Sequence, residues 1–279
     1  MARSRTPRPP GKTRQAENRE IDAIEHQSSP ATPIIYEIVR RMGDEEMARP
    51  AISLWWSGIA AGLSISFSLL AQSVLLTHLS DAPWRHLVVS LGYTVGFVMV
   101  VLSRQQLFTE NTLTAVLPVM AEFSRGKLGR LLRLWGIVLL ANLVGTLIAA
   151  TFCTFTPVLT PELREGMLAI SREITQHGWS ATFFHAVAAG FLMAAMVWLM
   201  PGATTAQFHV IVIVTFLIAA GGFVHIVAGS MEAFMLLLGG EIGVAFLLGE
   251  FFVPVLLGNI VGGTALFGLI AYAQVMKEL

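Results

Sequence analysis

Apolar residues follow one another in blocks long enough to cross a lipid bilayer. The blocks cover residues 52–76, 86–121, 134–156, 179–201, 208–238 and 251–275. Because a transmembrane helix needs about 20 such residues, the pattern predicts a polytopic all-α membrane protein with six spans. The second and fifth blocks are too long for one ordinary crossing. Each of them predicts two half-helices joined by an irregular segment.

Polar residues mark the irregular segment in each long block. The second block is interrupted in LSRQQLFTENT by Arg104, Thr109, Glu110 and Asn111, and the fifth contains His225 in an otherwise apolar run. Irregular backbone at membrane depth survives only where protein or a water-filled cavity satisfies its polar groups. Each break in a long helix therefore predicts a cavity.

A second matched pair follows the breaks. Asn142-Leu-Val-Gly145 lies in the third block and Asn259-Ile-Val-Gly262 in the sixth. This recurrence predicts two three-span repeats, inverted relative to each other because each contains an odd number of spans. A buried amide must be paired, and a broken helix offers free backbone groups. We therefore expect Asn142 and Asn259 to brace the breaks rather than to contact a permeant.

Glycine pairs four residues apart predict close contacts between helices, because small residues let two backbones approach. The pairs are Gly58 and Gly62, Gly92 and Gly96, and Gly258 and Gly262.

Basic residues predict the orientation and the domain limits. The 122–133 loop carries Arg125, Lys127, Arg130 and Arg133, and such charges gather on the cytoplasmic side, so six spans place both termini in the cytoplasm. Polar residues 1–32 predict a disordered cytoplasmic tail. Residues 33–50 predict an amphipathic helix that lies on the membrane surface or packs as a cap on the bundle. Residues 51–279 are expected to form the six-span channel or transporter domain.

Composition supports the membrane class and excludes others. Hydrophobic residues make up 54% of the chain and charged residues 13%, against about 25% charged in soluble domains. The formal net charge is zero, which gives no reason to expect nucleic acid. The seven histidines lack metal-ligand spacing and no nucleophile motif occurs, so we expect no metal, no cofactor and no enzyme activity.

His225 and Thr109 are the strongest candidates for the substrate pathway. An ionisable side chain inside a span is costly and usually faces a cavity or a partner. Thr109 offers a hydroxyl to a permeant or to His225, so the two residues form a pair across the two breaks. The alternative for His225 is a neutral ring that donates one hydrogen bond to a backbone carbonyl freed by the break.

The neighbours of Thr109 predict a constriction and a cap. Leu107 and Phe108 supply apolar walls, and Asn111 caps the following half-helix by accepting from its first free amides. The amino end of a half-helix favours an anion. The alternative is a kinked helix with an ordinary cap.

Arg104, Tyr93 and Phe97 precede Thr109 and are also placed on the pathway. For each of them a purely structural role is an open alternative. Arg104 faces the pathway and attracts an anion, or extends to a membrane interface. Tyr93 and Phe97 share a helix face and line the same path, or serve as ordinary packing.

Three motifs carry a family resemblance: LFTEN at 107–111, FVH at 223–225 and PVLLGNIVGG at 254–263. Over residues 33–275 the chain resembles the formate/nitrite transporter family, in a bacterial inner-membrane branch. The resemblance implies a homopentamer in the lipid bilayer, with an aquaporin-like protomer fold and a pore in each protomer. It implies small monovalent anions or their weak acids as permeants, such as formate, nitrite, hydrosulfide, acetate or lactate. The family's central threonine, central histidine and span-six asparagine fall on Thr109, His225 and Asn259.

The chain departs from the family pattern beside both breaks. Before LFT the family usually has a glycine and an acidic residue, and this chain has Arg104 and Gln106 in their places. Before the central histidine the family usually has an acidic residue or asparagine, and this chain has Val224. The family's vestibule lysine falls on Gly178, with His177 beside it as a substitute. In a widely discussed family mechanism the anion enters a vestibule, takes a proton and crosses the constrictions as a neutral acid.

Two other functions remain open from the sequence. One is an aquaporin-like pore for a neutral solute, although the breaks lack a paired Asn-Pro-Ala motif. The other is a non-transporting membrane interaction protein on the same fold, which the altered neighbours of the breaks favour.

Overall fold

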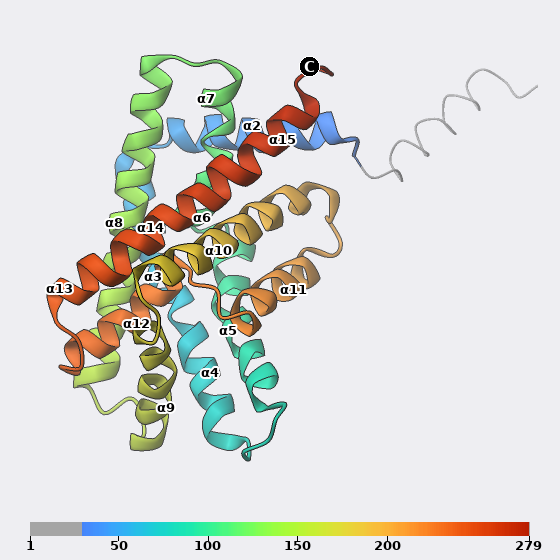
Figure 1. Ribbon diagram of the computed structural model, residues 1–279. Coiled ribbons are helices and arrows are strands. Elements are labelled where there is room, and N and C mark those ends of the chain that lie inside the picture. The colour runs from blue at the N-terminus through green and yellow to red at the C-terminus, as the bar shows by residue number, and fades with distance from the viewer. Residues whose placement is uncertain (1–29, 279) are drawn as a thin grey trace, which may run out of the picture. The chain divides into compact units, whose positions relative to one another are not determined.

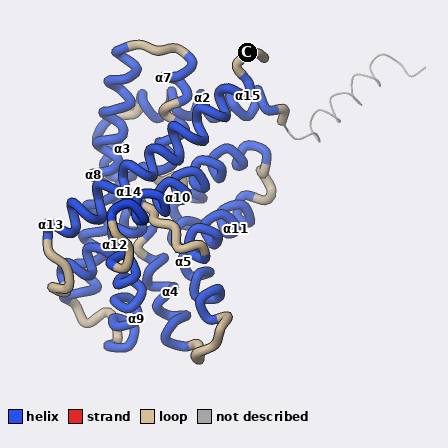
Figure 2. The backbone as a smooth tube through the Cα atoms, in the orientation of Figure 1, coloured by secondary structure: helices blue, strands red, loops and turns tan. Residues whose placement is uncertain are grey.

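The computed structural model describes residues 30–278, and within that range every regular element is a helix (Figures 1 and 2). The tail predicted over residues 1–32 lies almost wholly outside the described residues. The described helices begin with α2 (Thr32–Ala48), and α3 (Ala51–Ile65) and α4 (Phe67–His78) form the first span, which bends at Ser66.

The long apolar blocks become helices at the predicted places. Five continuous stretches are long and apolar enough to cross a membrane: Ala51–His78, Arg85–Leu102, Arg125–Phe155, Trp179–Gly202 and Val244–Val275. The third of these is α8 (Arg125–Phe155), and the fourth consists of α10 (Trp179–Leu199) and η2 (Met200–Gly202). The prediction of an all-helical membrane protein is confirmed.

Both long blocks are broken, as predicted. The second block divides into α5 (Arg85–Leu102), α6 (Phe108–Thr114) and α7 (Leu117–Ala121). The fifth divides into α11 (Gln207–Ala220) and α12 (Ile226–Leu238). In each case a non-helical segment of a few residues separates the half-helices, so backbone groups are left without intrahelical partners.

The two halves repeat the same packing. In the first half α3 packs along α8, and α2 lies against α6 and α7. In the second half α10 packs along α14 (Val253–Ile260), and α9 (Pro161–Ser171) lies against α12. Each half therefore contains a short preceding helix that covers its own half-helix.

Glycines allow the closest of these contacts. A Cβ at Gly62 would overlap the Asn142 carbonyl, and one at Gly262 would overlap the backbone of Val187. In the same way, Gly96 lies against the backbone of Ile65. The predicted close approach of helices at the glycine pairs is confirmed for these positions.

Helix α2 packs as a cap on the bundle. It buries Tyr36, Val39, Gly43 and Met47, whereas Ile34, Ile38 and Met42 on its other face stay exposed. The packing alternative is therefore observed, and a location on the membrane surface stays a prediction.

The last span is irregular and returns to the first described helix. It runs through α13 (Val244–Phe246), a π-helix η3 (Leu247–Phe252), α14, a second π-helix η4 (Val261–Gly268) and α15 (Leu269–Val275). Helix α15 packs on α2, with the Tyr36 and Tyr272 ring centroids 6.1 Å apart. The first and last described helices thus lie at the same end of the bundle.

Candidate functional site

Asn142 on α8 closes the first break. Its Oδ1 accepts a hydrogen bond of 3.0 Å from the Phe108 amide, and its Nδ2 donates to the carbonyls of Gln106 at 2.8 Å and Gly58 at 2.9 Å. One fully buried amide therefore pairs two backbone groups that the break leaves free, at Gln106 and Phe108, and ties them to the Gly58 carbonyl in the middle of α3.

Asn259 on α14 closes the second break by the same pattern. Its Oδ1 accepts 2.8 Å from the Ile226 amide, and its Nδ2 donates to the carbonyls of Val224 at 3.0 Å and Ala186 at 2.8 Å. The expectation that the two asparagines brace the breaks is confirmed. We refer to these two sets of hydrogen bonds as the Asn142 clamp and the Asn259 clamp.

The two clamps show which residues of the two halves correspond to each other. This correspondence corrects the pairing of His225 with Thr109 as equivalent positions of the repeat. Leu107 lies between Gln106 and Phe108, as His225 lies between Val224 and Ile226. Both precede a half-helix in the same extended backbone, with φ −112° and ψ 126° at Leu107 and φ −106° and ψ 129° at His225. The counterpart of His225 in the repeat is therefore Leu107 and not Thr109.

His225 and Thr109 nevertheless meet at the centre of the bundle. Thr109 Oγ1 lies 2.6 Å from His225 Nε2, and both side chains are buried. His225 Nδ1 accepts a hydrogen bond of 3.2 Å from the Ala228 amide, which caps α12. Because Nδ1 accepts, the neutral ring carries its proton on Nε2 and donates to Thr109. The Thr109 hydroxyl proton is then free to point at a permeant.

The predicted cap by Asn111 is wrong. Leu107 occupies the cap position of α6 and no side chain accepts there. Asn111 instead donates from Nδ2 to Gln106 Oε1 at 3.2 Å, and its own carbonyl accepts from Trp135 Nε1 at 3.0 Å. The amide oxygen of Asn111 is one turn too far along the helix to reach its first amides.

An aromatic row leads to the histidine along α5. The Tyr93 and Phe97 ring centroids lie 5.0 Å apart, and the Phe97 ring lies edge-on to His225 at 5.1 Å. The shared helix face predicted for Tyr93 and Phe97 is present. Leu107 is buried one residue before α6, and Phe108 packs edge-on against Trp135 at 5.7 Å.

Arg104 is not brought to this centre. It lies in the bend between α5 and α6 with φ 52°, a left-handed conformation that is uncommon outside glycine. Its side chain is exposed and does not line the cavity beside His225. The placement of Arg104 on the pathway therefore gains no support from this geometry.

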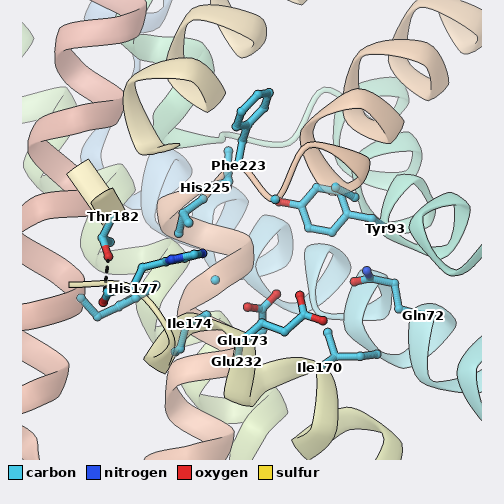
Figure 3. A pocket seen from close by; sticks show the side chains of 15 residues that line it. Gln72, Tyr93, Ile170, Glu173, Ile174, His177, Thr182, Phe223, His225 and Glu232 are labelled. Atoms are coloured by element: carbon cyan, nitrogen blue, oxygen red, sulfur yellow. Dashed lines mark hydrogen bonds between the residues drawn. The ribbon is translucent and has the colours of Figure 1, made fainter. Parts of the chain in front are cut away.

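A cavity of about 100 Å³ reaches His225 from one end of the bundle (Figure 3). Its polar lining includes Gln72, Tyr93, His177 and two acidic residues, Glu173 on η1 (Arg172–Thr175) and Glu232 on α12. Sequence reasoning noted His177 and Tyr93 but assigned no role to Glu173, Glu232 or Gln72. Those three residues come from separate elements, so no local sequence motif predicts that they line one cavity.

The corresponding place in the first half holds a hydrogen-bonded pair. Thr114 is the eighth residue after Gln106, as Glu232 is the eighth after Val224. Thr114 Oγ1 donates 2.6 Å to Glu46 Oε2 at the end of α2. Burial raises the pKa of Glu46 from 4.5 to about 7, against the hydrogen bond from Thr114, which lowers it.

Two curated proteins are similar to the chain in sequence. The inner membrane protein YfdC of Escherichia coli is 43% identical over 245 residues, which cover 88% of this chain and 79% of YfdC. The formate channel FocA of Haemophilus influenzae is 29% identical, over 79% of this chain and 86% of FocA.

Two solved structures share the fold. A pentameric formate channel with formate bound has a TM-score of 0.68 at 22% identity, over 81% of this chain and 98% of that one. An FNT family ion channel has a TM-score of 0.73 at 21% identity, over 87% of this chain and 98% of that one. The profile of the formate/nitrite transporter family matches residues 33–273. The chain therefore belongs to the formate/nitrite transporter family.

Proposed function

We propose that the protein is a channel or proton-coupled transporter for a small monovalent anion or its weak acid. Formate and nitrite are the model permeants, since a formate channel is among its relatives. The pathway runs from the cavity past Tyr93 and Phe97 to the Thr109–His225 pair.

One observation carries the proposal. The two broken spans begin their half-helices at one point, where Thr109 and His225 meet at 2.6 Å. His225 donates to Thr109 and leaves the threonine hydroxyl proton available to an acceptor. A carboxylate or nitrite oxygen is such an acceptor. The apolar surroundings of the pair favour passage of the neutral acid over a fully charged ion.

The setting of the pathway is the bacterial inner membrane, with five copies forming the assembly. Both chain ends lie in the cytoplasm, because α2, α15 and the basic 122–133 loop belong to one end of the bundle. The cavity opens at the other end of α8, where α9 and η1 lie, and so faces the periplasm.

Flux into proteoliposomes tests the function. The purified protein is expected to pass formate, nitrite, hydrosulfide, acetate or lactate faster than protein-free liposomes, with a lower rate or altered pH dependence in His225→Ala. His209→Ala is the matched control, since His209 is exposed on α11. Absence of flux for the whole panel, in a protein that elutes as a folded oligomer, contradicts the proposal. Water or glycerol passage without anion flux points to a neutral-solute pore instead.

A further inference from the structure

The cavity beside His225 has two acidic side chains in its lining and no lysine or arginine to balance them. The carboxyl groups of Glu173 and Glu232 point into the same space from η1 and α12 (Figure 3). None of the residues that line the cavity is lysine or arginine. Within residues 30–278 neither carboxyl group has a hydrogen-bond or ion-pair partner. A free anion that enters alone therefore meets two carboxyl groups and no lysine or arginine side chain to pair with.

A third side chain lacks a partner at the same place. Gln72 on α4 is only 8% exposed, yet its Oε1 has no hydrogen-bond partner in the described part of the chain. The side chain projects into the cavity beside Tyr93 (Figure 3). A buried polar atom without a partner is costly. The Gln72 Oε1 atom is satisfied when a hydrogen-bond donor, such as an acid O–H, occupies the cavity.

The donors and acceptors around the cavity fit a carboxylic acid. The Gln72 amide and the Tyr93 hydroxyl donate to a carbonyl oxygen, and a carboxylate of Glu232 accepts an acid O–H. A cation fits the two carboxylates, but the path beyond leads to Phe223 and to the positive end of α12. The cavity thus suits a solute that brings an anionic oxygen and one proton together.

His225 is poorly arranged to supply that proton. Its Nδ1 accepts from the Ala228 amide and its Nε2 proton is held by Thr109. A second proton on Nδ1 would set two donors face to face and remove the cap from α12. The acidic group nearest to the incoming solute on the same helix is Glu232, two turns further on.

We propose that Glu232 is the proton-loading residue of the pore, and that the cavity binds a small carboxylate with one proton shared between its oxygen and Glu232. The inference rests on the proposed function and names the site where the permeant becomes a neutral acid. The O–H bond of protonated Glu232 breaks, its electron pair stays on the Glu232 carboxylate, and a new O–H bond forms on formate to give formic acid. A hydronium ion at the mouth then returns a proton to Glu232 through Glu173 and leaves a water molecule.

Several titratable groups surround this exchange and set its pH dependence. Glu173 and His177 lie on the segment before α10, Tyr93 on α5, and His225 on α12 with Glu232. His86 approaches Glu173, and His185 lies edge-on to His177 at 4.7 Å. Loss of water raises the pKa of the Glu173 carboxyl, against His86 and His177, which lower it. This shift keeps a proton on Glu173 at a higher pH than usual, as a relay requires.

The proposal predicts selection by basicity. Formate takes a proton readily, whereas nitrate and chloride do not at ordinary pH. The wild-type protein in proteoliposomes is expected to take up formate with one proton per anion, followed with an internal pH dye, and to pass nitrate and chloride about tenfold more slowly or less. In Glu232→Gln formate flux falls roughly tenfold or more and its rise at acidic pH flattens, while nitrate does not slow.

Asp81→Asn is the matched control, because Asp81 is an exposed acid in the loop after α4, outside the cavity. A second measurement does not depend on flux. Infrared difference spectra of the detergent-solubilised protein with ¹³C-formate are expected to show a change in a protonated-carboxyl C=O band that is absent in Glu232→Gln.

The outcomes separate the two proposals. Equal passage of formate and nitrate in the wild type, or an unchanged Glu232→Gln, overturns proton loading and leaves the anion channel standing. Flux of ammonium or sodium that disappears in Glu232→Gln overturns it in favour of a cation site. Absence of any weak-acid flux in the wild type overturns the proposed function and the inference with it.

Discussion

The two broken spans share one scaffold and differ in chemistry. The Asn142 clamp and the Asn259 clamp hold the same three backbone positions with hydrogen bonds of 2.8–3.0 Å. The residue at the cap is Leu107 in one and His225 in the other. Backbone geometry is therefore repeated, and function is placed in side chains that the repeat leaves free to vary.

Thr114 and Glu232, each eight residues after the first backbone position of its clamp, also share a place in the scaffold and differ in chemistry. In the first half Thr114 donates a hydrogen bond to Glu46 at the end of α2. In the second half Glu232 occupies that place, and its carboxyl group lines one cavity together with that of Glu173. The same position of the repeat thus carries a paired hydroxyl group in one half and a cavity-lining carboxyl group in the other.

The largest expected effect is loss of a clamp. Asn142→Ala and Asn259→Ala each leave two buried backbone groups of a break without partners, which costs on the order of 4 kcal/mol of folding free energy. We expect both variants to lose folded oligomer in detergent to a similar extent, measured by thermal midpoint and size exclusion. A strong loss in one variant and none in the other would break the equivalence of the two halves.

Close helix contacts come next. Gly62→Ala and Gly262→Ala place a Cβ on the backbone of the facing helix, and we expect each to cost about 2–3 kcal/mol. Gly136→Ala is the control, since nothing lies within 4 Å of a Cβ there. The thermal midpoints of the three variants in one detergent check this order. A Gly62→Ala midpoint equal to that of Gly136→Ala would show that α3 and α8 are free to separate.

A pH effect is expected at the Thr114–Glu46 pair of the first half. Folding raises the Glu46 pKa from 4.5 to about 7, so the folded chain holds a proton that the unfolded chain releases. The stability that this proton contributes is full below about pH 4.5 and falls as the pH rises to about 7. Glu46→Gln should remove this dependence and add about 1–2 kcal/mol at neutral pH. Thermal midpoints across that pH range measure this dependence, with Glu45→Gln as the exposed control. Parallel midpoint-against-pH curves for the wild type and Glu46→Gln would contradict the assignment to Glu46.

The smallest effect concerns the centre. His225→Leu makes the second cap resemble the first, loses the hydrogen bond to Ala228 and costs about 1 kcal/mol. Thr109→Val removes the hydroxyl and costs a similar amount. A double-mutant cycle on stability and on formate flux is expected to show coupling between the two residues. Strict additivity would mean that the 2.6 Å contact contributes nothing.

Sequence reasoning predicted what depends on long runs and on repetition. The spans, both breaks and the bracing asparagines follow from block length and from a motif that recurs. The role of Asn111 was wrong because its side chain engages Gln106, a contact that type and spacing do not specify. The pairing of Glu173 with Glu232 was missed because only the folded chain brings η1 over α12. Arg104 shows the same limit, since a charge in an apolar block does not reveal which way it points.

The two asparagines also differ in the helix that carries them. Asn142 sits in one regular helix of 31 residues, whereas Asn259 lies in a short α-helix between two π-helices. A π-helical stretch accommodates an extra residue per turn, so the sixth span contains slack in its register that the third does not. Removing one residue from η3 would let that stretch close into an ordinary α-helix and leave the rest of the span in phase with Asn259. Within residues 30–278 the π-helices lie in this span, so a one-residue change of length there is absorbed without moving the Asn259 clamp.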